Sequence, residues 1–231
     1  MQLKDKIVLI TGASTGIGKT IAKIFMQKGS KLIVFGQNKP ALEVEFYKVD
    51  VSNELEIKKQ LSKLNKIDIL INNAGIAKIA NIEYTDTKIL DDMININLKG
   101  VFWMSKYTIP HINKGGCIIN ISSLAGIKSF EGYGIYCATK AAVISLTKTL
   151  AIELAKNKIR ANCIAPGIID TEIWEKMFGK NGRKILKESE DYVLLKRSGK
   201  PEEIAKTAIY LAENDFIDGE TILVDGGENL K

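Results

Sequence analysis

Seven short apolar runs, separated by helix-like segments, constrain the fold of this chain more than any other feature. Each run is continuous in branched and aliphatic residues, which is typical of strands buried on both faces of a parallel sheet. This alternation predicts a single α/β domain over residues 1–231, built as a doubly wound parallel sheet of about seven strands with helices on both faces. The runs are residues 6–10, 31–35, 46–49, 67–71, 117–121, 159–164 and 221–224.

A glycine-rich turn follows the first run directly. Residues 11–18 read Thr-Gly-Ala-Ser-Thr-Gly-Ile-Gly, and apolar residues then recur at helical spacing until Gly29. A strand, a glycine turn and a helix in this order point backbone N–H groups and a helix N-terminus at a phosphate. The spacing is G-x-x-x-G-x-G rather than the commoner G-x-G-x-x-G. The turn therefore predicts nucleotide binding around Gly12, Gly16 and Gly18.

The residues after the second strand normally read the adenosine ribose of a dinucleotide. An acidic residue there suits a free 2′-hydroxyl, and an arginine suits a 2′-phosphate. Here the chain reads Gly36-Gln37-Asn38-Lys39, with neither. Gln37 and Asn38 could hydrogen-bond a ribose and Lys39 could pair with a phosphate, so this stretch leaves the choice open.

The connection between the second and third strands is short. It has only about ten residues and includes Pro40, which is near the lower limit for a parallel crossover that contains a helix. We expect at most one helical turn there, so that side of the sheet should be unusually bare.

Tyr136 and Lys140 form a chemically useful pair. They stand four residues apart at the start of an apolar segment without Gly or Pro, so they share one side of a helix predicted to end near residue 156. An adjacent ammonium favours the phenolate of a tyrosine, whose pKa is ordinarily about 10. A tyrosine moved toward neutral pH can act as a general acid or base. Taken alone, however, the pair is better explained as a packed phenol and a surface amine.

Other polar residues follow the ends of neighbouring strands. Residues 72–75 read Asn-Asn-Ala-Gly after the fourth strand, and Ser123 follows the fifth. Ligands of an open parallel sheet bind beyond the carboxyl ends of its strands, so we expect one crevice to hold these residues, the glycine turn and Tyr136. A long helix is predicted over residues 86–111, interrupted by Asn95, Asn97 and Gly100. Asn97 needs a polar partner if it is buried.

The composition excludes several other classes of protein. A formal charge of +6 is spread along the chain without a basic cluster, which argues against nucleic-acid binding. Cys117, Cys137 and Cys163 are expected to be reduced core thiols. A single histidine, His111, leaves little for a metal site, and we predict none. Because the first residues lead into a strand and no apolar run reaches about 18 residues, we expect a cytoplasmic protein without a signal peptide or membrane span.

Six motifs, in order, resemble those of the short-chain dehydrogenase/reductase family. They are TGASTGIG (11–18), NNAG (72–75), ISS (121–123), YCATK (136–140), PGIIDT (166–171) and VDGG (224–227), and they span essentially the whole chain. The resemblance implies a Rossmann-like, NAD(P)-dependent oxidoreductase that interconverts an alcohol and a carbonyl by hydride transfer. It also implies catalytic roles for four residues: Tyr136 as acid or base, Lys140 as its cationic partner and ribose ligand, Ser123 as carbonyl binder, and Asn97 as holder of a water in the proton relay.

The resemblance implies further contacts with the cofactor, NAD or NADP. Gly36 stands where NAD-preferring members often have Asp, and Gln37 where NADP-preferring members often have Arg. Thr15 also lacks the basic side chain of many NADP users, so the preference stays open. Thr171 matches a position that hydrogen-bonds the carboxamide and phosphate region, and Ile169 one whose backbone orients the nicotinamide. The expected cofactor-binding residues are Gly12, Ser14, Thr15, Gly16, Ile17, Gly18, Gln37, Asp50, Val51, Asn73, Ala74, Gly75, Tyr136, Lys140, Pro166, Gly167, Ile169 and Thr171.

The substrate is expected to be read by residues 168–200, a loosely patterned segment typical of a lid or binding loop. A small alcohol or sugar hydroxyl is slightly favoured over a 3-oxoacyl-[acyl-carrier-protein], because no defined basic patch is visible for an acidic carrier. From another class, a catalytically inactive nucleotide-sensing regulator is the alternative, although all four catalytic positions are filled. The resemblance also implies a homotetramer built partly through the two long helices.

Overall fold

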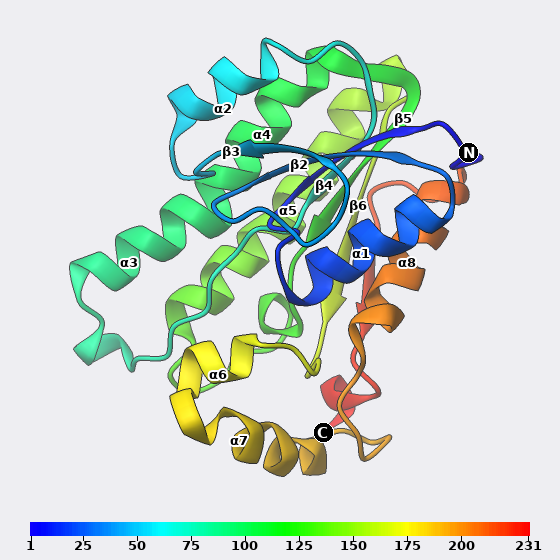
Figure 1. Ribbon diagram of the computed structural model, residues 1–231. Coiled ribbons are helices and arrows are strands. Elements are labelled where there is room, and N and C mark those ends of the chain that lie inside the picture. The colour runs from blue at the N-terminus through cyan, green and yellow to red at the C-terminus, as the bar shows by residue number, and fades with distance from the viewer.

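The computed structural model describes residues 1–231 and confirms the predicted fold class (Figure 1). Seven strands form one sheet in the order β3-β2-β1-β4-β5-β6-β7, and every neighbouring pair is parallel. From β1 the chain adds β2 and β3 on one side, and it then returns to add β4 to β7 on the other side. β1 and β4 therefore flank the switch point where ligands of such sheets bind. The strands are β1 (Ile7–Thr11), β2 (Lys31–Gly36), β3 (Glu45–Lys48), β4 (Ile67–Asn72), β5 (Ile112–Ile121), β6 (Arg160–Pro166) and β7 (Thr221–Val224).

Helices cover both faces of the sheet (Figure 1). Along β1, Val8 and Ile10 point into a core completed by α1 and α8, whereas Leu9 points into a second core completed by α2, α4 and α5. Each large aliphatic side chain buried in this way contributes about 1.5–3 kcal/mol. The helices are α1 (Gly16–Gln27), α2 (Glu54–Leu61), α3 (Thr87–Met93), α4 (Gly100–Thr108), α5 (Gly134–Leu154), α6 (Ile173–Phe178), α7 (Gly182–Ser189) and α8 (Pro201–Glu213).

The connection from β2 to β3 contains no helix, in agreement with the sequence. Residues 37–44 instead run as bends, and Pro40 is buried within them. The adenosine side of the crevice is therefore bordered by an irregular segment rather than by a helix.

The helix expected over residues 86–111 is interrupted near Asn95, Asn97 and Gly100, as predicted. It is divided into α3, a π-helical segment (Ile94–Lys99), α4 and a short 3-10 turn (Ile109–His111). Another prediction is wrong: residues 168–200, expected to be irregular, contain α6 and α7. These two helices lie beyond the end of the sheet at which β6 ends (Figure 1).

The three cysteines are free and buried, as expected. One helix with its following turn (Gly134–Asn157) is long and apolar enough to cross a membrane by length and composition alone. It forms α5, whose Leu150 and Leu154 pack in the core against the sheet, as the central helix of a doubly wound fold does. The helix is therefore weak evidence for a membrane span.

Candidate active site

The glycine turn is built in a conformation that only glycine adopts readily. Gly12 and Gly16 have φ angles of +69° and +55°, in the left-handed region that disfavours a side chain. A Cβ atom on Gly12 would also lie 2.8 Å from the Cα of Ala74. The turn and the Asn-Asn-Ala-Gly motif after β4 are thus packed backbone to backbone.

Two side chains brace this contact. The hydroxyl of Thr11 accepts hydrogen bonds from the N–H groups of Asn73 and Ala74, both at 3.0 Å. The side-chain amide of Asn73 donates back to the carbonyl oxygens of Thr11 and Gly12, at 3.0 and 2.9 Å. Asn73 therefore holds the turn in shape.

The turn fits a phosphate group of a dinucleotide. The first N–H groups of a helix have no partner within it, and Thr15, which precedes α1, makes no capping hydrogen bond through its side chain. The first turn of α1 also carries no acidic residue. An anion is the natural partner for these N–H groups and for the positive end of the helix dipole.

Ser123 and Tyr136 come together as the sequence predicts. The Ser123 hydroxyl accepts a hydrogen bond from the N–H of Ala125 at 3.1 Å, which leaves its own proton free to donate. Burial raises the pKa of Tyr136, and a hydrogen bond with Ser123 partly opposes that rise. The neighbouring Ser122 is bound to the carbonyl of Lys140 at 2.8 Å, so Ser123 is the serine available to a substrate.

Lys140 lies one turn further along α5. Its ammonium donates to the carbonyl of Ile121 at 3.0 Å and lies 5.7 Å from the centre of the Tyr136 ring. Burial lowers the pKa of Lys140 to about 8. The expected displacement of the Tyr136 pKa toward neutrality does not occur in this structure, because burial of the phenol outweighs the effect of its neighbours.

A pH-dependent contribution to stability follows for the protein without bound ligands. From pH about 8 to 10.5 the unfolded chain holds a proton on Lys140 that the folded chain has released, so the free energy of unfolding should rise with pH. The total rise from this group is on the order of 3 kcal/mol. Urea unfolding at a series of pH values measures it. Lys140→Met, which cannot titrate, should lack this rise, and identical pH slopes in the two proteins would contradict the assignment.

Asn97 is fully buried within the π-helical segment. Its side-chain oxygen accepts from the N–H of Ile76 and its nitrogen donates to the carbonyl of the same residue, both at 2.8 Å. A Cβ atom on Gly75 would lie 3.2 Å from this oxygen and 3.5 Å from the ammonium of Lys140. Asn97, Lys140 and the end of the Asn-Asn-Ala-Gly motif therefore meet at one point. π-Helical turns are rare and are often found at functional sites.

The remaining residues expected at the cofactor differ in how they are placed and exposed. Thr171 lies within 3.4 Å of the position of a Cβ atom on Gly16, so the segment after β6 touches the glycine turn. Gln37 is exposed, and Val51 is buried. Asp50 directs its carboxylate to the N–H and hydroxyl of Ser52, at 2.9 and 2.7 Å, rather than into the crevice.

Sequence reasoning missed Glu228. Its buried carboxylate accepts the N–H of Ile168 at 3.0 Å, across 60 residues of chain, and burial raises its pKa. A Cβ atom on Gly167 would lie 2.6 Å from the same carboxylate. Glu228 thus fixes the turn after β6 that precedes Ile169. The only signal for it was an acidic residue directly after the closing VDGG motif.

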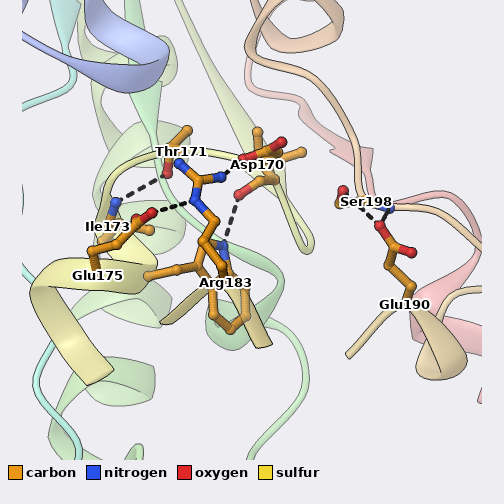
Figure 2. A network of polar contacts seen from close by, with 9 residues as sticks. Asp170, Thr171, Ile173, Glu175, Arg183, Glu190 and Ser198 are labelled. Carbon is orange, nitrogen blue, oxygen red and sulfur yellow. Dashed lines mark hydrogen bonds and ion pairs between the residues drawn. The ribbon is translucent and has the colours of Figure 1, made fainter. Parts of the chain in front are cut away.

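Arg183 was also missed. Figure 2 shows its guanidinium between the carboxylates of Asp170 and Glu175, while Glu190 accepts from the N–H and hydroxyl of Ser198 at 3.2 and 3.1 Å. Arg183 ties α7 to α6 and to the loop after β6. These contacts hold the segment over the crevice, which is why it is not the irregular loop that the sequence suggests.

Several known proteins are similar to this chain in sequence and in fold over nearly their whole length. A family model described as Enoyl-(Acyl carrier protein) reductase matches residues 12–229. The chain is 38% identical to the 3-oxoacyl-[acyl-carrier-protein] reductase FabG of Thermotoga maritima, over 98% of this chain and 99% of that protein. It is 31% identical to the NAD-dependent glycerol dehydrogenase of Listeria innocua, over 99% and 96% of the two chains.

A solved structure agrees with these likenesses. The ligand-free aldohexose dehydrogenase (AldT) of Thermoplasma acidophilum superposes with a TM-score of 0.93 at 33% identity, covering 99% of this chain and 96% of that one. The motifs, the fold and the matches over the full length lead to one assignment: the chain belongs to the short-chain dehydrogenase/reductase family and is an oxidoreductase acting on CH–OH and C=O groups.

Proposed function

We propose that the protein uses NAD or NADP to interconvert a small alcohol or sugar hydroxyl and the corresponding carbonyl. The observation that carries this proposal is the meeting of Ser123, Tyr136 and Lys140 at the carboxyl end of β5, beside the phosphate-binding turn. The likeness to an aldohexose dehydrogenase and a glycerol dehydrogenase supports this class of substrate.

In carbonyl reduction, Tyr136 donates its phenolic proton to the carbonyl oxygen. Its raised pKa keeps the phenol protonated at neutral pH, which suits a general acid. Ser123 donates a hydrogen bond to the same oxygen and stabilises the negative charge that develops there. The nicotinamide, when bound, supplies the hydride. Lys140 stabilises the phenolate left by proton donation. Asn97 holds the backbone of Ile76, next to Gly75, which borders the Lys140 ammonium.

A second substrate class has its own support. The FabG relative at 38% identity favours a 3-oxoacyl thioester carried by an acyl carrier protein, and the net charge of +6 would attract an acidic carrier. We propose this as the alternative activity of the same four residues.

A substrate panel distinguishes these proposals. Aldoses would be mixed with the protein and with NAD or NADP, and small ketones and a 3-oxoacyl thioester with the protein and NADH or NADPH, and the absorbance of the reduced nicotinamide followed. Formation of reduced nicotinamide with aldoses, or its consumption with ketones, supports the first proposal, and consumption with the thioester alone supports the second. Tight cofactor binding without turnover on any substrate would indicate a nucleotide-sensing protein instead.

We also propose that the protein is cytoplasmic and forms a homotetramer through α4 and α5. Phe102 on α4 and Ile152 on α5 are 44% and 79% exposed, which is unfavourable for large apolar side chains in water. Light scattering should give a mass near four times the 25.5 kDa of one chain. Phe102→Glu should shift that mass downward, whereas Leu55→Glu, an exposed control on α2, should not. A monomeric wild type at assay concentrations would contradict the proposal.

A further inference from the structure

The adenosine side of the crevice is one exposed corner formed by two backbone segments. The N–H of Gly12 donates to the carbonyl of Phe35 at 2.9 Å, and a Cβ atom on Gly36 would lie 3.8 Å from the nitrogen of Gly12. The end of β2 therefore lies against the glycine turn. Residues 37–39 and Thr15, all exposed, lie in these two neighbouring segments.

No carboxylate is directed at this corner from the segments that form it. The stretch from Gly36 to Lys39 has no acidic residue. Asp50, at the end of the next strand, is bound to Ser52 through its carboxylate. A free 2′-hydroxyl consequently lacks the acidic partner that usually recognises it, and a 2′-phosphate would meet no repulsion from these two segments.

A positive charge reaches this corner from a distant part of the chain. The ammonium of Lys176, on α6, donates to the hydroxyl of Thr15 at 3.4 Å, across 161 residues of sequence. The indole N–H of Trp174 donates to the carbonyl of Ile169 at 2.8 Å, and Arg183 binds Glu175 (Figure 2). These contacts hold α6 in place and so direct Lys176 at the glycine turn.

We propose that Lys176 is a specificity-determining residue, which binds the 2′-phosphate of NADP and gives this protein a preference for NADP over NAD. The proposal rests on the proposed function, because it requires a nicotinamide dinucleotide at the glycine turn. Thr15, in the glycine turn, has no positive charge, and Lys176 supplies one from α6. Lys39, in the exposed stretch that follows β2, adds a second positive charge to the same side of the crevice. The glycerol dehydrogenase relative is NAD-dependent, so membership of the family does not by itself imply a preference for NADP.

Glu172, one turn before Lys176 on the same segment, does not cancel this selectivity. Its carboxylate oxygen lies 3.6 Å from the position of a Cβ atom on Gly16, at the part of the turn that receives the phosphates common to both cofactors. Repulsion from Glu172 therefore weakens NAD and NADP alike. The cation beside Thr15, together with Lys39, distinguishes the two cofactors.

Calorimetric titration of the wild type, Lys176→Gln and Lys180→Gln with four ligands tests the proposal. The ligands are NADP, NAD, and the fragments 2′,5′-ADP and 5′-AMP, which differ in the 2′-phosphate and lack the nicotinamide. Because a charge-assisted hydrogen bond is lost, Lys176→Gln should weaken NADP and 2′,5′-ADP about tenfold. NAD and 5′-AMP should be unchanged. Lys180, an exposed lysine of the same segment, is the matched control and should alter none of the four affinities.

Each other outcome overturns a specific statement. Equal weakening of NAD and NADP by Lys176→Gln would place the ammonium on the shared phosphates and refute the selectivity, while leaving the proposed function intact. Tighter binding of NAD than of NADP by the wild type would refute it as well. If the wild type bound neither dinucleotide, the proposed function itself would fail, and the role of Lys176 with it.

Discussion

Replacing Tyr136 with Phe is expected to lower turnover by about 10²–10⁴-fold, the range for loss of a general acid. Only the hydroxyl is removed, so the ring keeps its edge-on packing against Tyr133, with centroids 6.2 Å apart. Cofactor affinity should therefore stay close to that of the wild type. Steady-state kinetics on the best substrate of the panel, with calorimetric titration of the cofactor, measures both quantities.

Tyr133→Phe is the matched control for this experiment. Tyr133 is a neighbouring tyrosine whose pKa is also raised by burial, but it has no hydrogen bond with Ser123, so its hydroxyl is not held beside the carbonyl-binding serine. Its replacement should reduce turnover far less than that of Tyr136. Near-normal turnover of Tyr136→Phe, or equal losses in the two variants, would refute the mechanism proposed above.

Gly18→Ala should abolish measurable cofactor binding and destabilise the protein. A methyl group on Gly18 would overlap the side-chain nitrogen of Asn73 and the carbonyl oxygen of Gly12. Neither atom can withdraw without breaking the hydrogen bonds that join Asn73 to the turn. Overpacking of this kind typically costs about 1–3 kcal/mol, and the displaced turn would no longer present its N–H groups to a phosphate. Urea unfolding and titration with NAD and NADP measure the two effects.

Gly115→Ala provides the comparison for Gly18→Ala. Gly115 has a φ angle of +83°, and a Cβ atom there would meet nothing within 4 Å. This change introduces backbone strain at the far end of β5, so it should lower stability without altering cofactor affinity. Wild-type affinity in Gly18→Ala would show that the glycine turn tolerates a side chain and does not have the rigid geometry described here.

Local patterns in the sequence were sufficient for the sheet and most of its helices. The strands are continuous branched runs, and α8 begins at Pro201 and carries acidic residues in its first turn, so each could be read from a few adjacent residues. Glycine spacing likewise pointed to the turn before α1. Ser123 could be chosen over Ser122 because it stands thirteen residues before Tyr136, the spacing that the family resemblance implies.

Features that depend on distant contacts could not be read in this way. The amide of Asn97, in the π-helical segment, binds the backbone of Ile76, 21 residues away. Glu228 and Lys176 act across 60 and 161 residues. α6 and α7 have only six and eight residues, too few to display a helical period, and their arrangement depends on the ion pairs of Arg183.

In the π-helical segment, the chain length that suits a regular helix differs from the one that positions Asn97. A π turn closes its hydrogen bonds over five residues rather than four, so it accommodates one residue more than an α-helix would need. Deleting a single codon between positions 94 and 99 would allow α3 and α4 to join as one regular helix, which is intrinsically more favourable. The same deletion would rotate the remaining side chains about the helix axis and carry the Asn97 amide away from Ile76. A chain shorter by one residue in this segment would therefore form a more regular helix but would lose the position of Asn97 in the catalytic centre.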